Sequence, residues 1–141
     1  MSYNALIRTH HITSRKKVAA LKQAASAHNC FVLLRSGGIP GIMYVEAKDK
    51  AAVDAWVNVV RSLRYKDFQL VTRPGVVEGD FRRQNENGKQ KNAVDSNGRG
   101  VKNEKDPGIG LEEVETVKDF GGIMEGRGVW GWWRKGMGYV S

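Results

Sequence analysis

The sequence predicts an α+β fold of the ferredoxin-like type, a β-α-β-β-α-β sandwich. Two observations support this class. Residues 15–28 and 49–64 repeat apolar residues at helical spacing, while residues 30–34 form a short continuous apolar run, which is typical of a buried strand. Right-handed crossovers place both helices on one face of the sheet and leave the other face free, apart from whatever part the C-terminal tail covers.

The first β-α-β unit is expected over residues 5–34. Residues 5–12 have the composition of a strand, and Ser14 follows as a favourable N-cap for the helix over 15–28. The apolar run at 30–34 then forms the second strand.

The second unit begins with a hairpin. Residues 36–41 (SGGIPG) carry strong turn signals, so 42–45 is expected to return alongside the preceding strand. The helix over 49–64 has the clearest periodicity of the chain, with apolar residues at Val53, Trp56, Val57, Val60 and Leu63. A short strand over 68–72 completes the pattern.

Residues 78–107 are rich in glycine, asparagine and charge and contain one aromatic residue. They offer too little apolar surface to offset the cost of ordering the backbone. We predict that they form a mobile insertion in a single domain, 1–141, whose core is 4–73 and whose C-terminal extension is 111–141.

The C-terminal extension is rich in tryptophan. Helices are expected over 113–125 and 129–135, and the second contains Trp130, Trp132 and Trp133. Trp130 and Trp133 are three residues apart and share a helix face, so packing against the sheet is the favoured interpretation. The alternative is that this region docks a protein partner.

The 141 residues carry a formal net charge of +8 and one cysteine. Residues 1–72 contain 11 Lys and Arg against 4 Asp and Glu, a net of +7, so the charge belongs to the first half and favours an anionic partner. One cysteine excludes a disulfide framework and a cysteine-based zinc site. No apolar run approaches the roughly 20 residues of a membrane span. The first residues do not resemble a secretion signal, so we expect an intracellular protein, nuclear or cytoplasmic, that binds no membrane.

The strongest candidate for anion binding is the start of the first expected helix. Arg15, Lys16 and Lys17 lie in the first turn, where the helix dipole is positive and free N–H groups prefer anions. A phosphate there would meet cationic side chains and backbone donors together. Lys22 lies seven residues from Arg15, on the same helical face. The alternative interpretation is a solvated basic face.

Further candidates lie near the expected sheet. Arg8 and His10 share one face of the first strand, and Arg35 and Tyr44 flank the hairpin turn, where a cation and an aromatic ring could hold a phosphate and a stacked base. Arg64 and Lys66 follow the second helix. Ordinary packing or solvation competes at each position, above all for Tyr44, for Arg64 at a helix C-terminus, and for His10. No spacing pairs a histidine with a catalytic partner, so no catalytic residue, metal or cofactor is predicted.

The chain resembles the ferredoxin-like domain found at the C-terminus of the spliceosomal U4/U6 pre-mRNA processing factor and after the RWD domain in RWD-containing proteins. The resemblance covers 5–72 and 111–140. Its motifs are His10-His11-Ile12, Gly38-Ile39-Pro40-Gly41-Ile42, Tyr44-Val45-Glu46, Leu63-Arg64-Tyr65-Lys66 and Gly128-Val129-Trp130-Gly131-Trp132-Trp133-Arg134. The chain departs from the family at Ala47, where glycine is usual, and at Tyr65, where tryptophan is usual.

The splicing branch of that family binds small nuclear RNA, so the resemblance implies a non-catalytic RNA-binding module. The candidate contacts are Arg8, His10, Arg15, Lys16, Lys17, Lys22, Arg35, Tyr44, Arg64 and Lys66. The alternative is a protein-interaction module that uses the free sheet face or the tryptophan-rich tail. An enzyme on the same fold is disfavoured, because fold analogy alone gives no warrant for catalysis.

Overall fold

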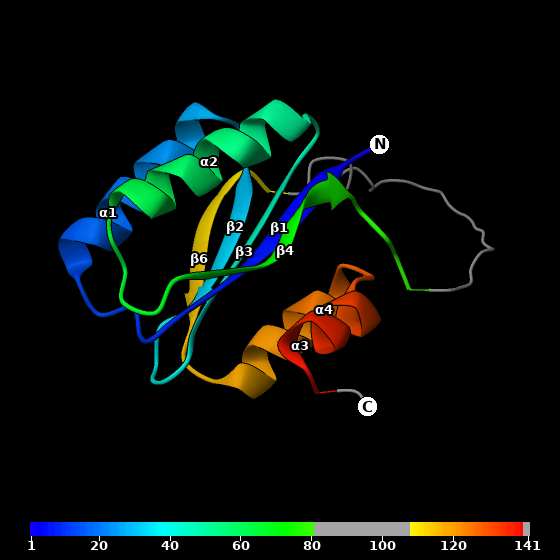
Figure 1. The fold of residues 1–141 in the computed structure, drawn as a ribbon. Helices are drawn as coiled ribbons and strands as arrows, with labels where there is room; N and C mark the ends of the chain where they lie inside the picture. The colour runs from blue at the N-terminus through cyan, green and yellow to red at the C-terminus, as the bar shows by residue number, and fades with distance from the viewer. Residues whose placement is uncertain (81–107, 140–141) are drawn as a thin grey trace.

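Two pairs of helices enclose a five-stranded sheet between them (Figure 1). This computed structural model describes residues 1–80 and 108–139. The described elements are, in chain order, β1 (Tyr3–Thr9), α1 (Arg15–Ala27), β2 (Phe31–Arg35), β3 (Gly41–Ala47), α2 (Lys50–Ser62), β4 (Gln69–Val76), β6 (Gly110–Val114), α3 (Val117–Gly126) and α4 (Trp130–Met137). The α+β class predicted from the sequence is confirmed.

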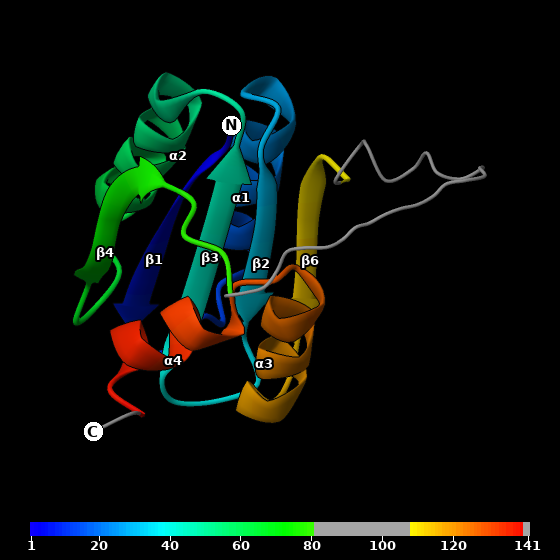
Figure 2. The ribbon, with the colours of Figure 1, turned by 90° about the vertical axis from the view of Figure 1, so that its right-hand side faces the viewer.

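The sheet is mixed. Figure 2 shows its strands side by side in the order β4-β1-β3-β2-β6. β1 pairs antiparallel with β3 and β4, and β2 pairs antiparallel with β3. The fifth strand, β6, pairs parallel with β2, with Phe31 opposite Gly110 and Arg35 opposite Val114.

The helix expected over 113–125 is wrong at its start. Residues 110–114 form β6, and α3 begins only at Val117, where the Thr116 side chain accepts a hydrogen bond from the Asp119 N–H. The predicted insertion, 78–107, falls almost entirely on residues outside the described part of the chain.

Each face of the sheet has its own core. Alternate residues such as Ile7 and Val45 pack under α1 and α2, in a cluster that includes Trp56. The residues between them, such as Leu6 and Tyr44, pack under α3 and α4. The sheet face that the sequence left open is therefore covered, and its apolar residues are not available to a partner. Among the described helices, none has the length and apolar character to cross a membrane.

Candidate nucleic-acid interface

Most of the predicted cations gather at one end of the sheet. β1, β2 and β6 run in one direction and β3 and β4 in the other, so the connections after β1, β2, α2 and β6 meet at the same end. We call residues 8–17, 35–41 and 63–69 the basic end. Eight of the ten candidate residues lie there, namely Arg8, His10, Arg15, Lys16, Lys17, Arg35, Arg64 and Lys66.

Backbone hydrogen bonds hold the basic end together. The His10 N–H donates to the Lys66 carbonyl at 2.9 Å, and the Gly41 N–H donates to the His10 carbonyl at 3.1 Å. The Ser36 N–H donates to the Val114 carbonyl at 3.0 Å. Segments that are far apart in the sequence are thus fixed against each other.

The first turn of α1 begins at the predicted cap. The Ser14 hydroxyl accepts a hydrogen bond from the Lys17 N–H at 3.2 Å. Arg15, the first helical residue, donates two hydrogen bonds to the Glu113 carboxylate of β6, at 2.9 and 3.0 Å. The Ser36 hydroxyl donates to the same carboxylate at 2.8 Å. One of the three cations in this turn is therefore neutralised by an internal acid.

Glu113 is a residue of this region that the sequence did not single out. The hydrogen bond from Arg15 lowers the pKa of the Glu113 carboxyl, partial burial opposes this, and the Ser36 hydrogen bond and the charges of Arg15 and Lys22 lower the pKa further. Lys22, two helical turns along α1, therefore acts on the same carboxylate as Arg15. No spacing in the sequence connects residue 113 with residue 15.

The other two cations of the turn form no ion pair with an acid in the part of the chain that the structure describes. The Lys17 ammonium lies 4.9 Å from the centre of the Tyr65 ring, and Tyr65 is buried. This burial raises the pKa of Tyr65 to about 12. Lys16 is exposed and makes no ion pair with any residue that the structure describes. The three cations of the first turn of α1 thus lie close together, and an internal acid neutralises only Arg15.

The connection between α2 and β4 adds two more cations. Arg64 follows the helix in a left-handed conformation, with φ at 60°, and both Arg64 and Lys66 are exposed. Asp67 places a carboxylate oxygen 3.4 Å from the His10 Nδ1. His10 thus has an acidic neighbour that its sequence spacing did not reveal.

Arg8 and Arg35 lie in one row across the sheet, because both are register partners of Ile42 on β3. They differ in what they contact. The Arg35 guanidinium donates to the carbonyls of Glu115 (2.8 Å) and Pro40 (3.0 Å), so it joins the hairpin turn to the chain after β6. Arg8 is half-buried, and its side chain makes no hydrogen bond or ion pair within the described residues.

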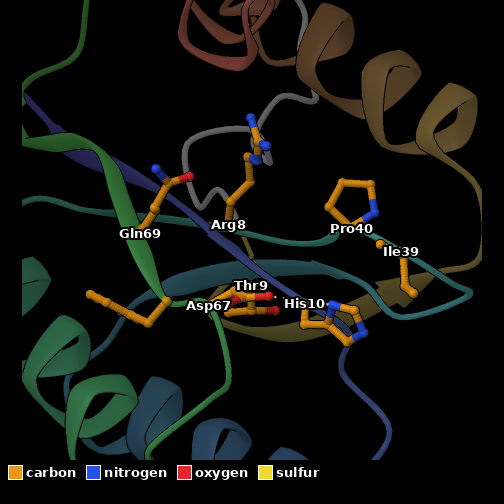
Figure 3. A pocket seen from close by; sticks show the side chains of 8 residues that line it. Arg8, Thr9, His10, Ile39, Pro40, Asp67 and Gln69 are labelled. Atoms are coloured by element: carbon orange, nitrogen blue, oxygen red, sulfur yellow. Dashed lines mark ion pairs between the residues drawn. The ribbon is translucent and has the colours of Figure 1, made fainter.

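A pocket of about 530 Å³ surrounds the end of β1 (Figure 3). It lies between the hairpin turn and the start of β4. Its lining residues are Arg8, Thr9, His10, Ile39, Pro40, Asp67, Phe68 and Gln69. Among the described residues, no three His, Cys, Asp or Glu side chains gather closely enough to hold a metal ion.

The expectation that Tyr44 stacks on a base is wrong. Tyr44 is fully buried, because α3 and α4 cover its face of the sheet. Its hydroxyl donates to Glu46 at 2.6 Å and accepts from the Asn4 amide at 3.1 Å, and the Trp132 ring meets it edge-on with centroids 5.7 Å apart. Burial is the main cause that raises the pKa of Tyr44. Since the ring is buried, Tyr44 packs in the core.

The expected packing of the tryptophan-rich tail is confirmed for Trp133 and wrong for Trp130. Trp133 is 4% exposed and stacks on Phe120, with ring centroids 5.8 Å apart. Trp132 is half-buried, and Trp130 is 39% exposed with the Arg134 guanidinium 4.6 Å from its ring centre. Trp133 is therefore not available to a docking partner, whereas Trp130 keeps an exposed face.

Comparison with known proteins gives no family assignment. A scan against models of protein families finds no match, and neither does a search of curated proteins. The interface is therefore interpreted from its own geometry.

Proposed function

We propose that this chain is a non-catalytic RNA-binding module, with a ferredoxin-like core related to the domain shared by the U4/U6 splicing factor and RWD-containing proteins. The observation that supports RNA binding is the gathering of cations from several distant segments at one end of the sheet. Lys16, Arg64 and Lys66 are exposed there, beside the positive pole of α1. RNA phosphates are the ligand class that such a surface favours.

Two features support the proposed relationship. The order of the first four strands, β4-β1-β3-β2, is the order of the split β-α-β fold. Three of the family-like motifs, those at 10–12, 38–42 and 63–66, also meet at the basic end, where His10 is bonded through its backbone to both of the other segments. In this proposal, the motifs build the RNA-binding surface.

The mechanism is electrostatic. Phosphates of the RNA displace bound counterions when they meet Lys and Arg, so affinity falls with salt by a slope of roughly −0.7 per phosphate contacted on a single strand. Lys16 and Lys66 contribute most in this scheme, because they are exposed and form no ion pair with described residues. Arg15 contributes less, since Glu113 already binds it.

The test is fluorescence anisotropy with a labelled single-stranded RNA of mixed sequence, from 50 mM to 300 mM salt. The variant Lys16→Glu/Lys66→Glu reverses two charges at the basic end. The matched control, Lys48→Glu/Arg73→Glu, reverses two exposed charges outside the basic end. We expect the first variant to lose at least tenfold in affinity and the control to lose much less. Equal losses in the two variants, or no binding of the wild type at 50 mM salt, would contradict the proposal.

A further inference from the structure

The pocket at the end of β1 contains polar groups with unused hydrogen-bonding capacity. Arg8 pairs in register with Gln69 of β4, and Figure 3 shows both side chains pointing to the same side of the sheet, toward the layer of α3 and α4. Within the described residues, neither side chain makes a hydrogen bond or ion pair. A guanidinium and an amide thus lie side by side, both available to a ligand.

A second lining residue has an unsatisfied group. Thr9 is 3% exposed, and its hydroxyl has no hydrogen-bond partner in the part of the chain that the structure describes. Because this hydroxyl is itself buried, a ligand in the pocket does not reach it, and the ligand contacts come from the more exposed groups around it. Next to Thr9, His10 uses one ring nitrogen on Asp67 and keeps the other, Nε2, for further bonding.

The opposite wall of the pocket is apolar. Ile39, at the tip of the hairpin turn, is 62% exposed, and Pro40 follows it. Phe68, which also lines the pocket, is turned toward α2, where its ring packs against the core and the Arg61 guanidinium lies 5.0 Å from the ring centre. A ligand for this pocket therefore needs a flat or apolar body as well as an anionic group and a hydrogen-bonding edge.

An unpaired nucleotide has all three parts. We infer that the pocket holds one unstacked nucleotide of the bound RNA, with its phosphate on Arg8, its base against Ile39 and Pro40, and the base edge bonded to the Gln69 amide. This inference rests on the proposed function and adds to it a ligand subsite. It implies that single strands are preferred to duplexes, because a paired base cannot enter a pocket.

The experiment separates bases from phosphates. It compares a 12-nucleotide single-stranded RNA with an abasic ribose-phosphate strand of the same length. We expect the wild type to bind the strand with bases about fivefold more tightly, the lower end of the range for one packed base. Gln69→Leu and Ile39→Ser should reduce this ratio to about two, mainly by weakening the binding of the strand with bases, because neither substitution removes a charge. Arg73→Met is the matched control on β4 and should keep the full ratio.

Each contrary outcome has a distinct meaning. If the wild type binds both strands equally well, the pocket takes no base, although the basic end still binds RNA. If the wild type binds neither strand, the proposed function itself is wrong. If Gln69→Leu and Ile39→Ser reduce the affinity for both strands equally, the two side chains do not contact a base, and the subsite is rejected. Thermal unfolding of each variant shows that the comparison is made on folded protein.

Discussion

Arg15 and Glu113, which are 98 residues apart in the sequence, are joined by two hydrogen bonds of 2.9 and 3.0 Å. This pair ties the first turn of α1 to the last strand of the sheet. It also places a carboxylate among the cations of the basic end, where the Ser36 hydroxyl and the charge of Lys22 act on it as well. The Glu113 carboxylate therefore occupies a position suited to an external anion.

The first prediction concerns stability and pH. The pKa of Glu113 is lowered in the folded protein, so its contribution to stability is present above the unfolded pKa of about 4.3 and is lost as the pH falls through the folded value. Glu113→Gln should therefore be less stable than the wild type at pH 7 and nearly equal to it at pH 3. Urea unfolding at both pH values measures this difference. A gap of the same size at pH 3 and pH 7 would show that the charge of Glu113 is not responsible.

The second prediction concerns RNA affinity. Removing the charge of Glu113 frees Arg15 and takes away a repulsive group, so Glu113→Gln should bind RNA about two- to threefold more tightly at low salt, with the gain fading as salt screens it. Glu125→Gln removes an equal charge from the last turn of α3, far from the basic end, and should change affinity less. Anisotropy at 50 mM and 300 mM salt measures both. Weaker binding by Glu113→Gln would mean that the pair organises the surface rather than competing with the ligand.

The third prediction separates core from surface in the tryptophan-rich tail. Trp133 is 4% exposed and stacked on Phe120, so Trp133→Ala should lower the free energy of unfolding by about 3–5 kcal/mol. Trp130 is 39% exposed, so Trp130→Ala should cost below about 1 kcal/mol, the range of an exposed cation–π contact. Chemical denaturation compares the two. Similar costs at both positions would show that α4 packs differently.

The fourth prediction concerns the hairpin turn. A Cβ built on Gly37 would collide with the backbone carbonyl oxygen of Glu115 and lie 2.7 Å from its Cα. Gly37→Ala should therefore destabilise the protein by about 1–3 kcal/mol, because the turn must move away from the chain after β6. The control is Gly122→Ala inside α3, where a Cβ meets open space and alanine should stabilise by about 0.5–1 kcal/mol. If Gly37→Ala leaves the free energy of unfolding unchanged, the hairpin turn can move away from Glu115 at no cost.

The sequence predicts the elements whose signals are local. The two periodic helices, the cap at Ser14 and the hairpin after Arg35 were all found within a residue or two of their observed bounds. The strand β6 was missed because it is five residues long, contains two glutamates and pairs with β2 across more than 70 residues. Pairing over such a distance leaves no periodicity to detect.

The covered sheet face had a signal that the interpretation did not use. Residues 42–45 are apolar at every position, and a strand of that kind is buried on both faces. The apolar residues on either side of Tyr44 in the sequence therefore indicate that Tyr44 is buried. The clustering of basic residues at one end of the sheet, by contrast, could be predicted, because it follows from the strand directions of the predicted fold. The acidic partners of Arg15 and His10 could not, because they lie on segments that are distant in the sequence.

The two strands at the margins of the sheet are poorly suited to recruit another strand. β4 carries Pro74, which lacks an amide hydrogen, and its pairing with β1 is interrupted by register shifts. β6 is short and presents Glu112 and Glu113. Interrupted, charged margins of this kind discourage sheets from joining edge to edge. The protein should thus resist self-association and fibril growth even when concentrated, and neutralising the β6 glutamates would weaken that protection.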